Sequence, residues 1–140
     1  MSKIPEIVNS KLIDARYVRN YSNLVGNQLR MLGVTHELLQ SFYEKYVGPF
    51  WSERIGCELL DIVEGADNIS AMTLVCRDEF NFFSKYLVIS QLAAGQVVVL
   101  DTHTDEVYEV DFEGGERMLM AGTLKPRWNS FEKFLMDYFF

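Results

Sequence analysis

The chain has 140 residues, the usual length of one domain, and 49% of them are apolar, which excludes a disordered chain. Its formal net charge is −7, so we expect no nucleic-acid partner, because carboxylates repel phosphates. No apolar run reaches the roughly 20 residues needed to cross a membrane, and the N-terminus lacks the apolar segment of a secretion signal. We therefore expect one cytoplasmic domain over residues 1–140, without a membrane partner and with Cys57 and Cys76 as buried thiols.

The first third of the chain predicts helices. Apolar residues in segment 1–34 recur at near-helical spacing, which favours one or two short helices in a weakly patterned region. Thr35 is the predicted N-cap of a further helix, whose apolar residues follow the i, i+3 and i+4 spacing of a core-facing stripe. Gly48-Pro49 is its predicted end, because proline cannot continue a helix.

The middle of the chain predicts an antiparallel sheet. Residues 57–63 fit a strand or a helix, and residues 64–84 fit no single element. Residues 86–89 and 97–100 are short, apolar and rich in β-branched side chains, as in strands that are covered on both faces. A third strand follows at 107–112 after a polar turn, so an antiparallel meander is the simplest topology.

The end of the chain predicts a closing helix. Asn129 and Glu132 have the spacing of a capping box, and the aromatic residues after them form a stripe at helical spacing. Helices, antiparallel strands and one final helix together define an α+β fold. We expect a central, mostly antiparallel sheet flanked by N-terminal helices and a C-terminal helix.

Two tryptophans lie close to Gly or Pro breaks at the edges of predicted helices, Trp51 and Trp128. Large aromatic side chains at such positions fill a core more often than they bind a partner. We interpret both as core residues.

No catalytic signature is visible in the sequence. His36 and His103 are the only histidines, and we interpret both as solvated or locally bonded. Metalloprotease, phosphate-loop and hydrolase-elbow motifs are absent. A divalent-metal site among the carboxylates after residue 100 is an alternative, although these acids lack the ligand spacing of a calcium loop. We expect no enzyme activity, no metal and no cofactor.

The third strand and its flanking turns form an acidic hairpin. The segment from residue 57 to residue 117 contains thirteen acidic residues and only three basic ones. A solvated surface is one interpretation, and a binding site for a basic protein is the other, because repulsion between like charges costs stability unless a partner offsets it. The candidate partner-binding residues are Asp101, Asp105, Glu106, Glu109, Asp111, Glu113 and Glu116.

Several segments carry a family resemblance. Residues 86–89, 97–101, 107–110 and 128–135, together with Phe42-Tyr43 and Gly48-Pro49, resemble the SUKH superfamily in its Smi/Knr-like branch. The resemblance implies an antiparallel sheet flanked by helices, and it implies no catalytic residue. Many bacterial members are immunity proteins that neutralise toxin domains, often nucleases, and others, notably fungal ones, are regulatory or scaffolding proteins.

Charge and resemblance together predict a non-catalytic binding protein. The leading hypothesis is an immunity protein that covers the basic face of a toxin domain, such as a nuclease, by complementary charge. A regulatory or scaffolding module that binds an endogenous protein is the first alternative, and an unrecognised enzyme is the second.

Overall fold

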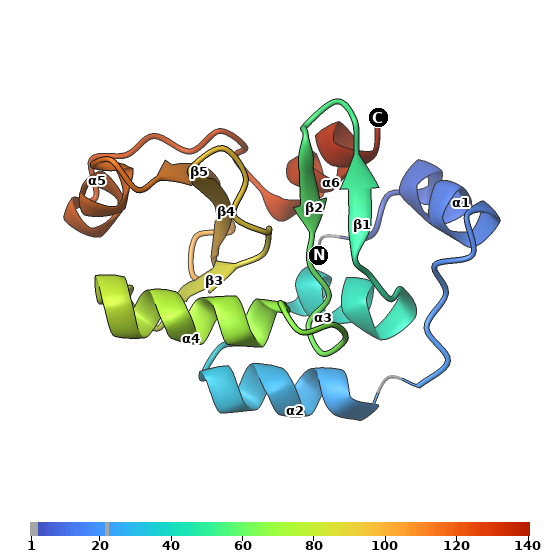
Figure 1. Cartoon of the computed structure of the whole chain (residues 1–140). Coiled ribbons are helices and arrows are strands. Elements are labelled where there is room, and N and C mark those ends of the chain that lie inside the picture. Colours follow the sequence, from blue (N-terminus) through green and yellow to red (C-terminus); the bar gives the residue numbers. More distant parts are fainter. Residues whose placement is uncertain (1–2, 22) are drawn as a thin grey trace.

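The computed structural model describes residues 3–21 and 23–140, which contain six helices and five short strands (Figure 1). Met1, Ser2 and Ser22 belong to the predicted domain 1–140 but lie outside the described residues. The α+β fold is confirmed, with helices first, antiparallel strands in the middle and a helix at the end. The elements are α1 (Glu6–Asp14), α2 (Asn23–Leu32), α3 (Glu37–Lys45), β1 (Phe50–Ser52), β2 (Cys57–Leu59), α4 (Ile69–Phe80), β3 (Tyr86–Val88), β4 (Gln96–Asp101), β5 (Val107–Asp111), α5 (Gly115–Ala121) and α6 (Phe131–Phe139).

Strands β3, β4 and β5 form the predicted antiparallel meander. Val99 of β4 lies opposite Val88 of β3 and opposite Tyr108 of β5. Strands β1 and β2 form a separate antiparallel pair, so the central sheet expected from the sequence is divided into two small sheets. An isolated bridge between Leu59 and Ser90 links the pair to the end of β3.

Side chains of the meander alternate between two apolar cores. Val98 packs into the larger core, whereas its neighbours Val97 and Val99 pack into the smaller one. Successive residues of a strand point to opposite faces, so a continuous apolar run serves both cores. The smaller core also receives Cys76 from α4 and Leu119 from α5. The prediction that these strands are covered on both faces is therefore confirmed.

A buried ion pair fastens the N-terminal segment to the rest of the molecule. The Arg19 and Asp61 side chains are 4% and 0% exposed, and Arg19 Nη2 donates to Asp61 Oδ1. Arg19 Nε also donates to the Tyr43 carbonyl over 2.5 Å. Asp61 accepts further hydrogen bonds from the Gly48 N–H at 2.9 Å and from two backbone N–H groups just after it. Each ion therefore has several hydrogen-bond partners besides the other, which offsets part of the cost of burying charge.

Two predicted helix caps are wrong by one residue. His36, not Thr35, caps α3 through a ring nitrogen, and Ser130, not Asn129, caps α6 through its hydroxyl. Helix α3 also ends earlier than predicted, at Lys45 rather than at the Gly-Pro pair. In each case a neighbouring residue satisfies the free backbone groups of the helix end.

Three elements were not predicted. Segment 64–84 contains α4, whose N-cap Asn68 accepts a hydrogen bond from the Ala71 N–H over 2.9 Å. Strand β1 has only three residues, and α5 starts after Gly114, which offers no capping side chain. Strand β1 and helix α5 are too short to show a clear period, and in α4 exposed apolar residues obscure the core-facing stripe.

Candidate functional site

The seven predicted partner-binding carboxylates do not share one surface. Asp101, at the end of β4, is 2% exposed. Its Oδ1 accepts hydrogen bonds from the N–H groups of His103 (2.9 Å) and Thr104 (3.2 Å), and its Oδ2 lies 3.2 Å from Lys85 Nζ. Asp101 therefore holds the turn after β4 and is not available to a partner, which corrects the candidate set.

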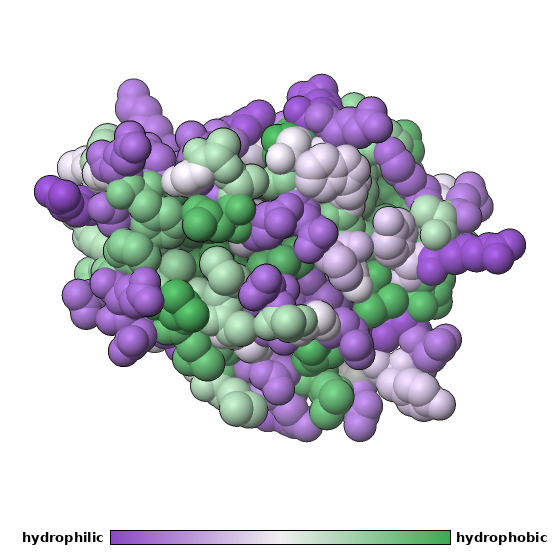
Figure 2. Space-filling view, viewed as in Figure 1, coloured by the Kyte–Doolittle hydropathy of each residue, from purple (hydrophilic) through white to green (hydrophobic). Residues whose placement is uncertain are grey.

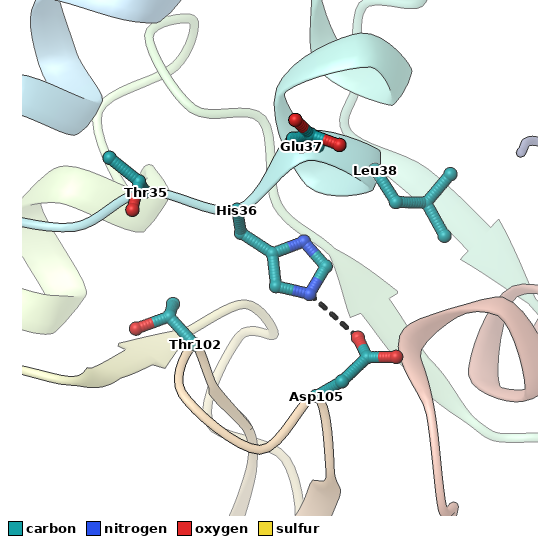
Figure 3. A pocket seen from close by; sticks show the side chains of 6 residues that line it. All are labelled: Thr35, His36, Glu37, Leu38, Thr102 and Asp105. Carbon is teal, nitrogen blue, oxygen red and sulfur yellow. Dashed lines mark hydrogen bonds and ion pairs between the residues drawn. The ribbon is translucent and has the colours of Figure 1, made fainter. Parts of the chain in front are cut away.

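Asp105 is half-buried, and its carboxylate points toward a histidine (Figure 3). Its Oδ1 lies 2.6 Å from His36 Nε2 and accepts the Phe131 N–H over 3.3 Å. His36 caps α3 and Phe131 begins α6, so one carboxylate connects the turn after β4 with the starts of two helices. The prediction that His36 is locally bonded is confirmed.

The hydrogen bonds of His36 limit its chemistry. Nδ1 accepts the Leu39 N–H over 3.1 Å, so the ring proton of the neutral histidine lies on Nε2 and is donated to Asp105. Neither nitrogen is free to bind a metal or to take a proton from a substrate. The pair borders an open hollow of about 420 Å³, toward which its side chains extend together with Thr35 and Thr102 (Figure 3).

Three further carboxylates have local partners. Glu106 accepts a hydrogen bond from the Tyr108 hydroxyl over 3.3 Å, and burial together with this carboxylate raises the pKa of Tyr108 to about 12. Glu109 forms an ion pair with Arg127. Glu116 accepts the Gly114 N–H over 3.2 Å at the start of α5. These three acids form contacts within the hairpin, with Arg127 and at the start of α5, so their charges are less available to a partner.

The remaining two acids lie at the other end of the hairpin. Asp111 and Glu113 are exposed, although Asp111 Oδ1 also accepts the N–H groups of Glu113 (3.0 Å) and Gly115 (3.1 Å). Neither forms an ion pair with any residue in the described part of the chain. This end is the part of the predicted site that stays accessible.

Helix α4 brings two more carboxylates to the same end. The Phe80 ring at the end of α4 lies 4.6 Å, centroid to centroid, from the Phe112 ring just after β5. The exposed residues Asp78 and Glu79 immediately precede Phe80, and neither forms an ion pair in the described ranges. We call the four residues Asp78, Glu79, Asp111 and Glu113 the acidic end.

Sequence reasoning missed the two acids from α4. Their run into an aromatic residue was visible, but the contact between two phenylalanines 32 positions apart was not. Two bases flank the acidic end in sequence, Arg77 and Arg117. Arg77 Nη2 donates to the Ser84 carbonyl over 2.8 Å, whereas Arg117 is exposed beside Glu116. With four acids and two bases, the net charge at this end is negative.

The tryptophans differ from each other. Trp128 is 6% exposed and donates from Nε1 to Asp137 Oδ2 over 2.9 Å, so its interpretation as a core residue is confirmed. Trp51 is 57% exposed, and its interpretation as a core residue is wrong. On β1 its neighbours Phe50 and Ser52 face inward, so the alternation of the strand turns Trp51 outward.

Both cysteines are free and buried, as predicted. Burial raises the pKa of the Cys76 thiol to about 11, and the charge of Glu79 contributes in the same direction. Burial also raises the pKa of the Cys57 thiol. Both thiols therefore stay protonated, and poor nucleophiles, near neutral pH.

The described ranges, 3–21 and 23–140, contain no group of three or more His, Cys, Asp or Glu side chains that could hold a metal ion. Within the same ranges, no helix has the length and apolar character needed to cross a membrane.

No known family model matches the chain, and no curated protein matches it either. The resemblance to the SUKH superfamily therefore stays a prediction.

Proposed function

We propose that this protein is a cytoplasmic, non-catalytic immunity protein that neutralises a basic toxin domain by binding it. The observation that carries this proposal is the acidic end: four exposed carboxylates from α4 and from the β5–α5 segment, without an ion pair in the described part of the chain. Complementary charge accelerates the encounter of two proteins and favours basic partners over acidic ones.

The rest of the molecule supports binding rather than turnover. His36, the histidine best placed for acid–base chemistry, has both ring nitrogens engaged in hydrogen bonds. Cys76 carries a thiol whose pKa is raised to about 11, mainly by burial, so it is a weak nucleophile. A nuclease is the toxin class that best fits an acidic inhibitor, because a nuclease needs a basic face for its phosphate-bearing substrate.

Co-expression with the protein encoded beside its own gene tests the proposal. We expect the two proteins to co-purify and the toxicity of the neighbour to disappear. The triple variant Asp78→Lys, Glu79→Lys, Glu113→Lys should restore toxicity because it reverses charge at the acidic end. The control variant Asp14→Lys, Glu53→Lys changes exposed acids outside the acidic end and should still protect.

Two outcomes would contradict the proposal. One is a neighbour that is neither toxic nor bound. The other is stable capture of an endogenous, non-toxic protein through the acidic end, which would favour the regulatory module.

A further inference from the structure

Helices α2 and α4 lie side by side and run in the same direction (Figure 1). A hydrogen bond of 3.0 Å between Ser70 Oγ and Gln28 Oε1 fixes their register. Three residues further along α2 is Met31, and four residues further along α4 is Leu74, so these two side chains lie at the same level of the helix pair. The seam between the helices is therefore lined by apolar side chains on its outer surface.

The outer face of this pair carries four exposed apolar residues, Leu24 and Met31 on α2 and Leu74 and Val75 on α4. Neither helix needs them for its own packing, because each buries a different stripe against the core. Apolar residues over both helices are visible on the front of the molecule (Figure 2). An apolar row on two neighbouring helices is typical of a protein contact.

Acidic residues border this row at both ends of α4. Glu64 and Asp67 precede the helix and are exposed. Asp78 lies one turn beyond Leu74 and Val75 on the same outward side, and Glu79 follows it. The face therefore continues directly into the acidic end.

The bases near this face are few and engaged. Arg30 donates to the Asn27 side chain, and Arg77 donates to the Ser84 carbonyl. Four carboxylates against two bonded guanidinium groups leave the border of the apolar row negative. A partner that fits this pattern carries apolar side chains along one face and lysine or arginine beside them.

We propose that the α2–α4 face is the docking site for a basic amphipathic helix of the protein partner. This inference rests on the proposed function and adds the location of the contact and the shape of the partner element. Leu24 and Met31 are seven residues apart, about 10.5 Å along α2. That spacing matches the i and i+7 anchors of a helix lying along the seam.

A model peptide tests the docking site without the toxin. The probe is a synthetic 14-residue peptide of leucine and lysine arranged so that all leucines share one helix face. We expect its addition to shift the amide signals of α2, α4 and the acidic end in ¹⁵N–¹H correlation spectra. A lysine-only peptide of equal charge should bind at least about tenfold more weakly, because it lacks the apolar anchors.

Matched variants locate the contact. Leu74 is 53% exposed and Leu92, in the β3–β4 turn, is 54% exposed, so serine at either position removes the same side chain at the same exposure. The double variant Met31→Ser, Leu74→Ser should raise the Kd for the peptide about tenfold or more. Leu92→Ser should change it by less than about twofold. Circular dichroism checks that each variant is folded.

Several outcomes would overturn the docking site. They are the absence of binding at millimolar peptide, signal shifts centred on another face, and equal weakening by Leu92→Ser. Self-association through α2 and α4 without peptide would identify a second copy as the occupant instead. Binding to lipid vesicles through this face would identify a membrane. Neutralisation of the toxin by the double variant would leave the proposed function intact and remove only the docking site.

Discussion

The two ends of the acidic hairpin carry the same kind of side chain in opposite roles. At one end, Asp101 is buried and Asp105 is half-buried, and both contact backbone N–H groups and a basic side chain, Lys85 or His36. At the other end, Asp111 and Glu113 are exposed and have no cationic partner among the described residues. Burial and a neighbouring Lys or His side chain decide the role of a carboxylate, so a count of acids overstates the binding surface.

Asp61, outside the hairpin, is another buried carboxylate, and its replacement should have the largest effect on stability. Asp61→Ala leaves the Arg19 guanidinium buried without its counter-ion, and we expect a loss of about 3–5 kcal/mol in the free energy of unfolding. Arg54→Ala removes one partner of an exposed ion pair and should cost at most about 1 kcal/mol. Urea unfolding measures both variants, and equal losses would contradict the distinction.

Asp101 should be the most costly position within the hairpin itself. Asp101→Ala removes a buried carboxylate that accepts two backbone N–H groups of the turn and pairs with Lys85, which should lower the free energy of unfolding by about 1–3 kcal/mol. Asp101→Asn keeps an acceptor oxygen and should recover part of this loss. Glu113→Ala, at the exposed end, should stay within about 0.5 kcal/mol of the parent. Equal losses in the free energy of unfolding for Glu113→Ala and Asp101→Ala would contradict the predicted difference between the two ends.

His36 and Asp105 should behave as one unit. His36→Ala removes the cap of α3 and should cost about 1 kcal/mol. Asp105→Gly removes the carboxylate without straining a backbone whose φ is 71°. Because the two side chains contact each other, a double-mutant cycle should give a coupling energy above about 0.5 kcal/mol. Additive losses would mean that the contact contributes nothing.

The pKa of the Cys76 thiol depends on burial and on the charge of Glu79 at the acidic end. Burial, aided by Glu79, raises the folded pKa to about 11, against about 8.5 for a free thiol. Stability from this group is therefore complete below about pH 8.5 and is lost as the pH rises toward 11, since only the unfolded chain ionises in between. In a Cys57→Ser background, the ¹³Cβ signal of Cys76 should still report a thiol at pH 9.5. Glu79→Gln should lower the pH at the midpoint of the Cys76 thiol titration. A titration midpoint below about pH 9 in the parent would contradict the account.

The sequence was most informative where side chains follow a short period. The third strand was predicted at 107–112, and in β5 the side chains of Tyr108 and Val110 pack into the smaller core while Asp111 is exposed. Continuous apolar runs correctly predicted β3 and β4 as strands covered on both faces. Helix α4 was obscured because Leu74 and Val75 are apolar yet exposed, which blurs the core-facing stripe.

The inward role of the carboxylates was not visible in the sequence. Arg19 and Asp61 are 42 residues apart, and Asp105 reaches His36 across 69 residues. Neither spacing belongs to a local motif, so only the packed fold brings the groups together. The same holds for the contact between Phe80 and Phe112, which adds Asp78 and Glu79 to the acidic end.

Association kinetics test the central claim most directly. The variant Asp78→Asn, Glu79→Gln, Glu113→Gln removes charge from the acidic end while keeping the side-chain shapes, and its stability should match the parent within about 0.5 kcal/mol. Stopped-flow mixing with the partner protein purified from the co-expression experiment, at low and high salt, measures the association rate constant. We predict a rate constant at least about tenfold lower than the parent at low salt, with a weaker dependence on salt. Identical rate constants and identical salt dependence for parent and variant would show that the acidic end does not guide the partner.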